Sequence, residues 1–312
     1  QATWCDYLGS PFSARLLRQL GEDFAAGGIV KDLVGGWRGS PRSDVVGLRL
    51  LGALHAAAMS NTAPDLTAVY PPHTQDAPIT IVWPAVQAFL DQNREWVTAF
   101  FKQTPQTNET RRALMLTAGF LWLAHRYNMP MNLLELGASA GLNTIWDHYS
   151  YKTDAWSWGE GSPVVIDTKW DGSSPPTSVK PEILARAACD IHPLDITDEG
   201  AVKRLRSYIW PDQTQRLARF DGAVKLARQA GYSVEQSDAG EWLARKLAAR
   251  PKNALTVVYH SVFFQYPPKE TRDYLRELIR KEGAAATDSA PLAWLRFEPE
   301  AMFSANTKSL VT

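Results

Sequence analysis

One stretch near the middle of the chain decides the fold, and it runs Leu133-Leu134-Glu135-Leu136-Gly137-Ala138-Ser139-Ala140-Gly141-Leu142-Asn143. An apolar run occupies its first part, small residues fill its centre, and a helical pattern follows from Gly141. Glycine at the end of a strand adopts backbone angles that residues with side chains resist. The stretch therefore predicts a strand at 132–136, a tight turn and a helix.

Strands and helices alternate in the sequence beyond this turn. Apolar runs predict strands at 164–167, 185–191, 232–236, 255–259 and 291–297, and helical periodicity predicts helices at 199–210, 213–230, 239–249 and 269–281. This alternation is typical of an α/β fold, a mostly parallel sheet with helices on both faces. The segment 150–171 differs, because Trp156, Trp158 and Trp170 lie among Gly, Ser and Asp, and we interpret it as an inserted hairpin.

The first 128 residues show helical patterns instead. Helices are predicted to start at Pro11, Val45, Pro84 and Glu109, with Ser10, Asp44 and Asn108 as capping residues. A strand-like pattern is confined to 79–83, and prolines enclose it. We therefore expect two parts, an all-helical N-terminal region at 1–128 and a Rossmann-like α/β domain at 129–312.

Composition excludes several classes of protein. The chain has 33 basic and 33 acidic residues, so it lacks the excess positive charge of a dedicated nucleic-acid binder. Cys5 and Cys189 are its only cysteines, which excludes a disulfide framework and a cysteine zinc cluster. The longest apolar stretches, 45–59 and 113–124, are too short to cross a bilayer. We expect a cytoplasmic protein, although the start at Gln1 without methionine leaves a removed targeting segment open.

The small-residue turn suits the binding of a nucleotide cofactor. Its pattern, acidic-x-Gly-x-x-x-Gly, resembles the first motif of S-adenosylmethionine-dependent methyltransferases with a Rossmann-like fold. The resemblance implies that the loop, formed by Gly137, Ala138, Ser139 and Gly141, packs against the methionine and ribose of the cofactor. It also implies that Glu135 helps to hold the loop and the amino group of the cofactor. Ser139 stands where these enzymes usually have a glycine, and a turn with no ligand is the alternative.

The same residues also match the motif of a second reaction class, nucleophilic catalysis by a serine. Residues 137–141 fit G-x-S-x-G, the nucleophile elbow of α/β-hydrolases, with Ser139 as the nucleophile. Asp195 or Asp238, and then His260, follow in the required chain order. The helical patterns upstream and the lack of a His-Gly-Gly segment disfavour this hypothesis, because the hydrolase fold needs strands and an oxyanion loop before the elbow.

Acidic residues at later strand ends favour the cofactor hypothesis. The residue that binds ribose hydroxyls follows the second strand, where Asp190 is the candidate, with Asp167 and Glu160 as alternatives. Asp238 and Ala239 follow another strand, where similar methyltransferases place an acid and a small residue against the adenine. A helix cap is the alternative role for Asp238.

His260 ends the predicted strand 255–259, at the edge of the sheet where catalytic groups gather. Its imidazole is the candidate general base, because it titrates near neutral pH. A hydrogen-bonded histidine beside the core is the alternative. The six histidines show no metal-ligand spacing, so we expect no metal.

Three segments together resemble an uncharacterised bacterial family, catalogued only as a domain of unknown function. They are 106–109 with Arg112, 133–143 with Trp146, Asp147 and Tyr149, and 189–195 followed by Trp210 and Pro211. The resemblance runs from about residue 10 to residue 299 and implies a helical N-terminal region before a methyltransferase-like domain. A methyltransferase sheet normally ends in an antiparallel hairpin, and only 309–312 remain to begin one. Either the chain is truncated or the sheet is incomplete.

These observations predict transfer of a methyl group from S-adenosylmethionine to a small or medium-sized acceptor, with no membrane or nucleic-acid partner. A non-catalytic protein that binds S-adenosylmethionine or a nucleotide is the alternative. The polar residues Gln106, Asn108, Glu109 and Arg112 lie between two apolar helices, and we expect them to cover the cofactor site. An exposed helix cap is the alternative role for this segment.

Overall fold

The computed structural model describes the whole chain except residues 61, 75, 232 and 301–312. Its internal contacts divide it into two units. One, here called the helical unit, comprises Gln1–Thr107 and Asp198–Phe220. The other, the sheet unit, comprises Asn108–Thr197 and Asp221–Thr312. Among the residues described, no helix has the length and apolarity needed to cross a membrane.

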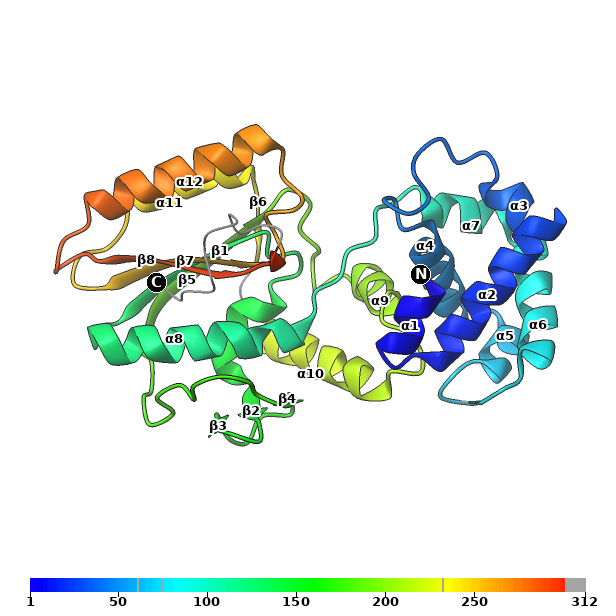
Figure 1. Cartoon of the computed structure of the whole chain (residues 1–312), viewed down its shortest axis with the longest axis horizontal. Coiled ribbons are helices and arrows are strands. Elements are labelled where there is room, and N and C mark those ends of the chain that lie inside the picture. The colour runs from blue at the N-terminus through cyan, green and yellow to red at the C-terminus, as the bar shows by residue number, and fades with distance from the viewer. Residues whose placement is uncertain (61, 75, 232, 301–312) are drawn as a thin grey trace. The chain divides into compact units, whose positions relative to one another are not determined.

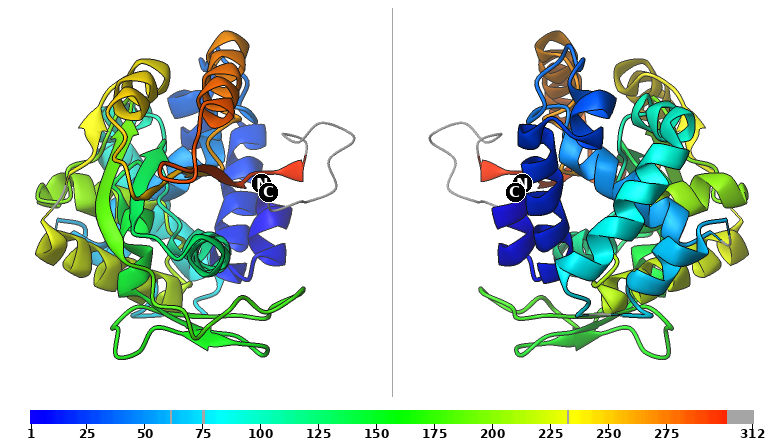
Figure 2. Two further views of the ribbon diagram at one scale, coloured as in Figure 1. Left: turned by 90° about the vertical axis from the view of Figure 1, so that its left-hand side faces the viewer. Right: turned by 90° about the vertical axis from the view of Figure 1, so that its right-hand side faces the viewer.

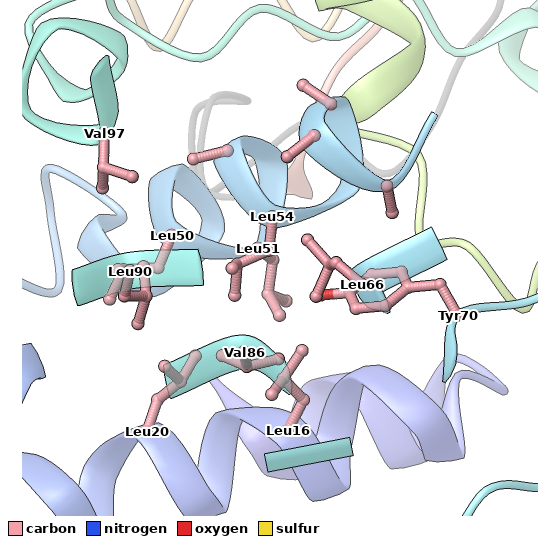
Figure 3. Close-up of a cluster of buried hydrophobic side chains, with 14 of the residues drawn as sticks. Leu16, Leu20, Leu50, Leu51, Leu54, Leu66, Tyr70, Val86, Leu90 and Val97 are labelled. Atoms are coloured by element: carbon pink, nitrogen blue, oxygen red, sulfur yellow. The ribbon is translucent and has the colours of Figure 1, made fainter. Parts of the chain in front are cut away.

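The helical unit buries the apolar faces of its helices in one core. Its helices are α1 (Ala2–Tyr7), α2 (Pro11–Ala26), α3 (Ile29–Val34), α4 (Val46–Ala58), α5 (Pro64–Val69), α6 (Ile79–Gln92), α7 (Arg94–Phe101), α9 (Glu199–Ser207) and the first part of α10 (Thr214–Ala230). Figure 3 shows Leu16 of α2, Leu54 of α4 and Val86 of α6 pointing toward one another. The periodic leucines of the sequence thus form the centre of this unit.

In the helical unit, the starts of α6 and α4 differ from the sequence-based prediction. The strand-like stretch at 79–83 is the beginning of α6, and Pro84 lies inside that helix instead of opening it. Val82 repeats with Val86 and Leu90 at a spacing of four, so burial of this face outweighs the one backbone hydrogen bond that proline cannot donate. Asp44 does not cap α4, because its carboxylate accepts a hydrogen bond of 2.8 Å from the indole of Trp37.

Over its described residues, the sheet unit contains five parallel strands in the order β6-β5-β1-β7-β8. The strands are β1 (Met131–Leu136), β5 (Ile183–Asp190), β6 (Glu235–Gln236), β7 (Leu255–Ser261) and β8 (Leu292–Phe297). α11 (Ala239–Ala248) and α12 (Lys269–Ala284) cover one face, and α8 (Ala113–Tyr127) covers the other (Figure 1), an arrangement that Figure 2 shows after a quarter turn. This confirms the predicted Rossmann-like α/β fold. Every residue of β1 is buried, as expected for a strand with helices on both faces.

The strand order reverses at β1, which pairs with β5 on one side and β7 on the other. Leu136 of β1 lies beside Cys189 of β5, and Glu135 lies beside Tyr259 of β7. The three strands therefore end at nearly the same level. Crevices at such a reversal, outside the carboxyl ends of the strands, are where α/β sheets bind ligands.

A second, three-stranded sheet occupies the tryptophan-rich segment. Its strands β2 (Ser150–Lys152), β3 (Ser157–Trp158) and β4 (Val165–Asp167) lie in the order β3-β2-β4, with β2 and β3 antiparallel and β4 parallel to β2. Asp167 therefore ends a strand of this small sheet and not of the large one. Glu160 follows β3 and is exposed.

The division into units differs from the boundary at 128 that the sequence suggests. α8 groups with the sheet unit, and 198–220 group with the helical unit. The reason for the first difference is packing, since Phe120 of α8 stacks on Trp146 with ring centroids 4.5 Å apart and meets the ring of Tyr259 of β7 at 5.1 Å. A helix pattern alone gives the buried face of α8 but not the element that it covers.

Candidate functional site

The turn after β1 has an unusual backbone. Gly137, Ser139 and Gly141 have φ angles of +67°, +56° and +73°, so each second residue is in the left-handed region. The amides of Gly137 and Ala138 both donate to the carbonyl of Cys189, at 2.9 and 3.1 Å, which ties the turn to the end of β5. A serine held at positive φ is strained, and such strain gathers at functional sites.

The helix that the sequence predicts after the turn is present, in a tighter form than an α-helix. It is a 3-10 helix, η2 (Leu142–His148), with non-helical angles at Ile145. The hydroxyls of Tyr149 and Tyr151 donate to the carbonyls of Leu142 and Trp146. These side chains satisfy backbone groups that an α-helix would pair internally, so the short helix is stable in this tighter form.

Asp190 lies at the carboxyl end of β5, directly beside the turn. Its Oδ2 accepts a hydrogen bond of 2.8 Å from the amide of Ser139, and its Oδ1 accepts one of 2.9 Å from the amide of His192. The side chain is half-buried, and each carboxylate oxygen can accept a further hydrogen bond. Of the three acids considered from the sequence, Asp190 is the one that the structure brings to the turn.

Glu135 is buried at the end of β1, with 2% of its surface exposed. Its Oε2 accepts hydrogen bonds from the hydroxyls of Thr144 on η2, at 2.5 Å, and Tyr259 on β7, at 3.1 Å. Burial raises the pKa of this carboxyl to about 7, although both hydrogen bonds act in the opposite direction. Glu135 thus connects the loop to two neighbouring strands.

Two polar atoms of the turn and of η2 have no hydrogen-bond partner within the described part of the chain. They are Oγ of Ser139 and Oδ1 of Asn143, and both are buried. The side-chain Nδ2 of Asn143 donates to the backbone carbonyl of Glu109 at 3.4 Å, which orients the carboxamide group of Asn143. An unsatisfied buried polar group costs about 1–3 kcal/mol, and one of these two lies in the turn and the other directly after it, in η2.

The segment 108–112 contacts the start of η2 and the end of β7. Asn108 accepts a hydrogen bond of 2.9 Å from the amide of Leu142, just after the turn, and Arg112 donates to the carbonyl of Ser261, the last residue of β7, at 3.4 Å. Glu109 caps the short 3-10 helix η1 (Thr110–Arg112) through the amide of Arg111, and α8 starts only at Ala113. The prediction that Asn108 caps a helix starting at Glu109 is therefore wrong. Gln106 belongs to the helical unit.

Asp238 caps α11, the alternative that the sequence left open. Its Oδ1 accepts hydrogen bonds from the amides of Gly240 and Glu241, at 2.8 and 3.2 Å. Ala239 is the first residue of that helix, just after β6. The pair thus lies at the carboxyl edge of the sheet, at the end of the strand next to β5.

His260 is fully buried in β7, and neither of its ring nitrogens is available. Nδ1 contacts Oε1 of Glu298 at 2.5 Å, and Nε2 accepts a hydrogen bond of 3.1 Å from the indole of Trp294. This pattern assigns a neutral ring whose Nδ1–H donates to Glu298. Burial lowers the pKa of His260, with Glu298 acting in the opposite direction. The arrangement matches a hydrogen-bonded core histidine and leaves no nitrogen for an acceptor or for Ser139.

Two residues at this edge were not identified from the sequence. Glu298 follows β8, and its Oε1 also accepts hydrogen bonds from the amides of Phe263 and Phe264. The ring of Phe263 lies against Gly137, where a β-carbon would stand 2.2 Å from its Cδ2. The search for acids at strand ends that singled out Asp190 applies equally to Glu298. No sequence signal indicates Phe263. Within the described residues, no three His, Cys, Asp or Glu side chains form a metal-binding group.

Comparison with known families gives a match over almost the whole chain. Residues 1–311 match the family described as "Uncharacterized protein conserved in bacteria (DUF2332)". The chain belongs to this family. The match covers the helical and sheet units alike and confirms the family resemblance drawn from the three sequence segments. Searches of curated proteins and of solved structures found no match.

Proposed function

We propose that the sheet unit binds S-adenosylmethionine at the carboxyl edge of β5, β1 and β7 and transfers its methyl group to a small or medium-sized acceptor. One observation carries the proposal. A strained small-residue turn lies where the strand order reverses, and an acid from the neighbouring strand bonds to it. This combination is the usual setting of a nucleotide site in an open α/β sheet.

The residues present fit such a cofactor. The turn residues Gly137, Ala138, Ser139 and Gly141 would hold the methionine and ribose, with Asp190 at the ribose hydroxyls and Asp238 and Ala239 at the adenine. Oγ of Ser139 and Oδ1 of Asn143 are buried and accept no hydrogen bond from any residue that the structure describes, which supports a polar ligand at the turn. Glu135 would help to hold the cofactor-binding loop in place, because its carboxyl already connects η2 with β1 and β7.

The bound cofactor would supply an electrophilic methyl group. The chain would then position the acceptor in line with that group and keep water away. The segment 108–112 supports this role, because it contacts the start of η2, just after the turn, and the end of β7. The two cysteines are buried and free, which supports the cytoplasm as the compartment.

Binding without catalysis is a second candidate, and the surroundings of His260 favour it. Both of its ring nitrogens are already bonded, so the base candidate of the sequence is not available. The two functions separate when the protein is incubated with labelled S-adenosylmethionine and the small-molecule fraction of a bacterial extract. A transferase moves the label to an acceptor, whereas a binding protein returns it unchanged.

Substitution of Asp190 by alanine is expected to weaken S-adenosylmethionine binding at least about tenfold, roughly 1.4 kcal/mol. The carboxylate would contact the ribose, and its loss also releases the amides of Ser139 and His192. Asp167→Ala and Glu160→Ala are matched controls that remove the same charge elsewhere. Titration calorimetry measures all three. If Asp167→Ala weakens binding equally, the contact with the ribose would be assigned to Asp167 of the small sheet.

Asn108→Ala is expected to weaken the same binding at least about tenfold. The substitution leaves the amide of Leu142, next to the turn, without its acceptor. Glu109→Ala is the comparison, because the Glu109 side chain accepts from the amide of Arg111, and its loss should cost about 1 kcal/mol of stability. If Asn108→Ala changes the melting temperature but not the affinity, the segment is structural only.

A further inference from the structure

The two oxygens of the Glu298 carboxyl group differ in their hydrogen bonds. Oε1 accepts from Nδ1–H of His260 at 2.5 Å and from the amides of Phe263 and Phe264 at 2.9 and 3.3 Å. Oε2 accepts no hydrogen bond from any residue that the structure describes, although only 2% of the side chain is exposed. Three N–H donors on one oxygen are typical of a carboxylate, so Oε2 is a buried and charged acceptor that can still take a donor.

The backbone beside Glu298 is strained in a way that fixes this carboxylate. Val262 follows β7 with a φ of +52°, in the left-handed region that a β-branched residue rarely adopts. Its amide donates to the carbonyl of Phe297 at 2.8 Å, and the next two amides, of Phe263 and Phe264, donate to Oε1. Consecutive amides of this kind form a concave anion site. Rotation of the carboxylate would break these hydrogen bonds, so Oε2 is held where it is.

Phe263 links this carboxylate to the turn after β1. Its amide donates to Glu298, and its half-buried ring lies against Gly137, where a β-carbon would stand 2.2 Å from Cδ2 of that ring. The ring of Phe264 stacks on that of His260, with centroids 4.5 Å apart. Aromatic rings attract cationic groups at their faces and pack against hydrocarbon. The surroundings of the Glu298 carboxylate thus suit a ligand with an apolar body and a hydrogen-bond donor at one end.

The positive charge of Arg296 on β8 does not supply the missing donor. Burial lowers the pKa of Arg296, and the charge of Glu298 acts in the opposite direction, so the two side chains influence each other through their charges. Oε2 nevertheless accepts no hydrogen bond from Arg296, whose Cζ lies 4.3 Å from the centroid of the Trp294 ring. The charge of the carboxylate is therefore partly balanced, and Oε2 still needs an N–H or O–H group.

We propose that Oε2 of Glu298 binds the amino group of a small amine whose hydrocarbon part packs against Phe263. An amino group supplies N–H donors, and in its protonated form it makes a charge-assisted hydrogen bond to a carboxylate, roughly twice as strong as a neutral one. A carboxylate or phosphate ligand would instead bring a second negative charge to Oε2. The inference rests on the proposed function in taking this amine as the acceptor, and the amino group serves here for recognition.

The test is titration calorimetry of the full chain with benzylamine, which is protonated at neutral pH, and with benzyl alcohol, which has the same ring without the charge. We expect saturable binding of benzylamine, at least about tenfold tighter than that of benzyl alcohol. Glu298→Gln should weaken benzylamine binding at least about tenfold, because glutamine keeps one acceptor oxygen but replaces the other with a donor. Glu277→Gln, at an exposed position of α12, is the matched control and should bind like the wild type.

Phe263→Leu is a second variant that keeps the test decisive if Glu298→Gln does not fold. The substitution removes the aromatic ring but keeps the amide that donates to Glu298, so benzylamine should bind at least about threefold more weakly. The proposal is overturned if benzylamine does not bind, if benzyl alcohol binds equally well, or if the folded variants bind benzylamine like the wild type.

Binding of benzylamine should persist when the demethylated product of S-adenosylmethionine is present in excess. Competition between the two would place the amine at the cofactor's own position and overturn the proposal. The amine site stands while the proposed function fails if benzylamine binds through Glu298 but S-adenosylmethionine does not bind the wild type. The reverse result leaves the cofactor site and removes the amine site.

Discussion

Replacement of Gly137 by valine is expected to abolish S-adenosylmethionine binding and to destabilise the sheet unit. The backbone here has a φ of +67°, which a β-branched residue almost never adopts. A β-carbon would also stand 2.2 Å from Cδ2 of Phe263. Left-handed backbone costs about 1–2 kcal/mol with a side chain, and overpacking adds about 1–3 kcal/mol.

Alanine variants separate the strain of the left-handed backbone from the steric clash with Phe263. Gly161 also has a positive φ, of +75°, but apart from its chain neighbours no described residue has an atom within 4 Å of the place of its β-carbon. Denaturant unfolding should therefore show a larger loss of stability for Gly137→Ala than for Gly161→Ala. Phe263→Ala combined with Gly137→Ala should recover part of the difference. Equal losses at the two glycines, together with unchanged ligand binding, would contradict the role assigned to the turn.

Glu135→Gln is expected to change how stability depends on pH. Burial raises the folded-state pKa of Glu135 from 4.5 to about 7, so the fold favours the protonated carboxyl. The corresponding stability is fully present below pH 4.5 and is lost as the pH rises toward 7, by an amount on the order of 3 kcal/mol. Glutamine resembles the neutral carboxyl and can accept from Thr144 and Tyr259. The variant should therefore be the more stable protein at pH 8.

Urea unfolding at several pH values between 4.5 and 8 measures this effect. Glu277→Gln, at an exposed position of α12, is the control and should follow the wild type at every pH. A Glu135→Gln protein with the same pH dependence as the wild type would mean that the carboxyl is not buried as described.

Much of the sheet was predictable because parallel strands covered on both faces are continuous apolar runs. The run at 132–136 is β1 with one residue added, and 255–259 is β7 with two added. The start of α6 was not predictable in this way, because a short apolar stretch between prolines has no periodicity of its own. Only its continuation through Val86 and Leu90 makes it helical.

The parts of the candidate site whose position follows from the order of the strands were predictable. Asp190 ends the strand beside β1, and any parallel sheet of this order brings it to the turn. The environment of His260 could not be predicted, because Trp294 and Glu298 lie more than thirty residues further on and reach the ring only through the pairing of β7 with β8. Phe263 is similar, since its contact with Gly137 depends on the path of a loop.

The most direct measurement for the central claim is titration calorimetry of the wild-type chain with S-adenosylmethionine and its demethylated product, with ATP and NAD as comparison ligands. The predicted result is saturable binding of both S-adenosyl compounds, tighter than that of ATP or NAD. The absence of any binding heat at millimolar S-adenosylmethionine would contradict the claim.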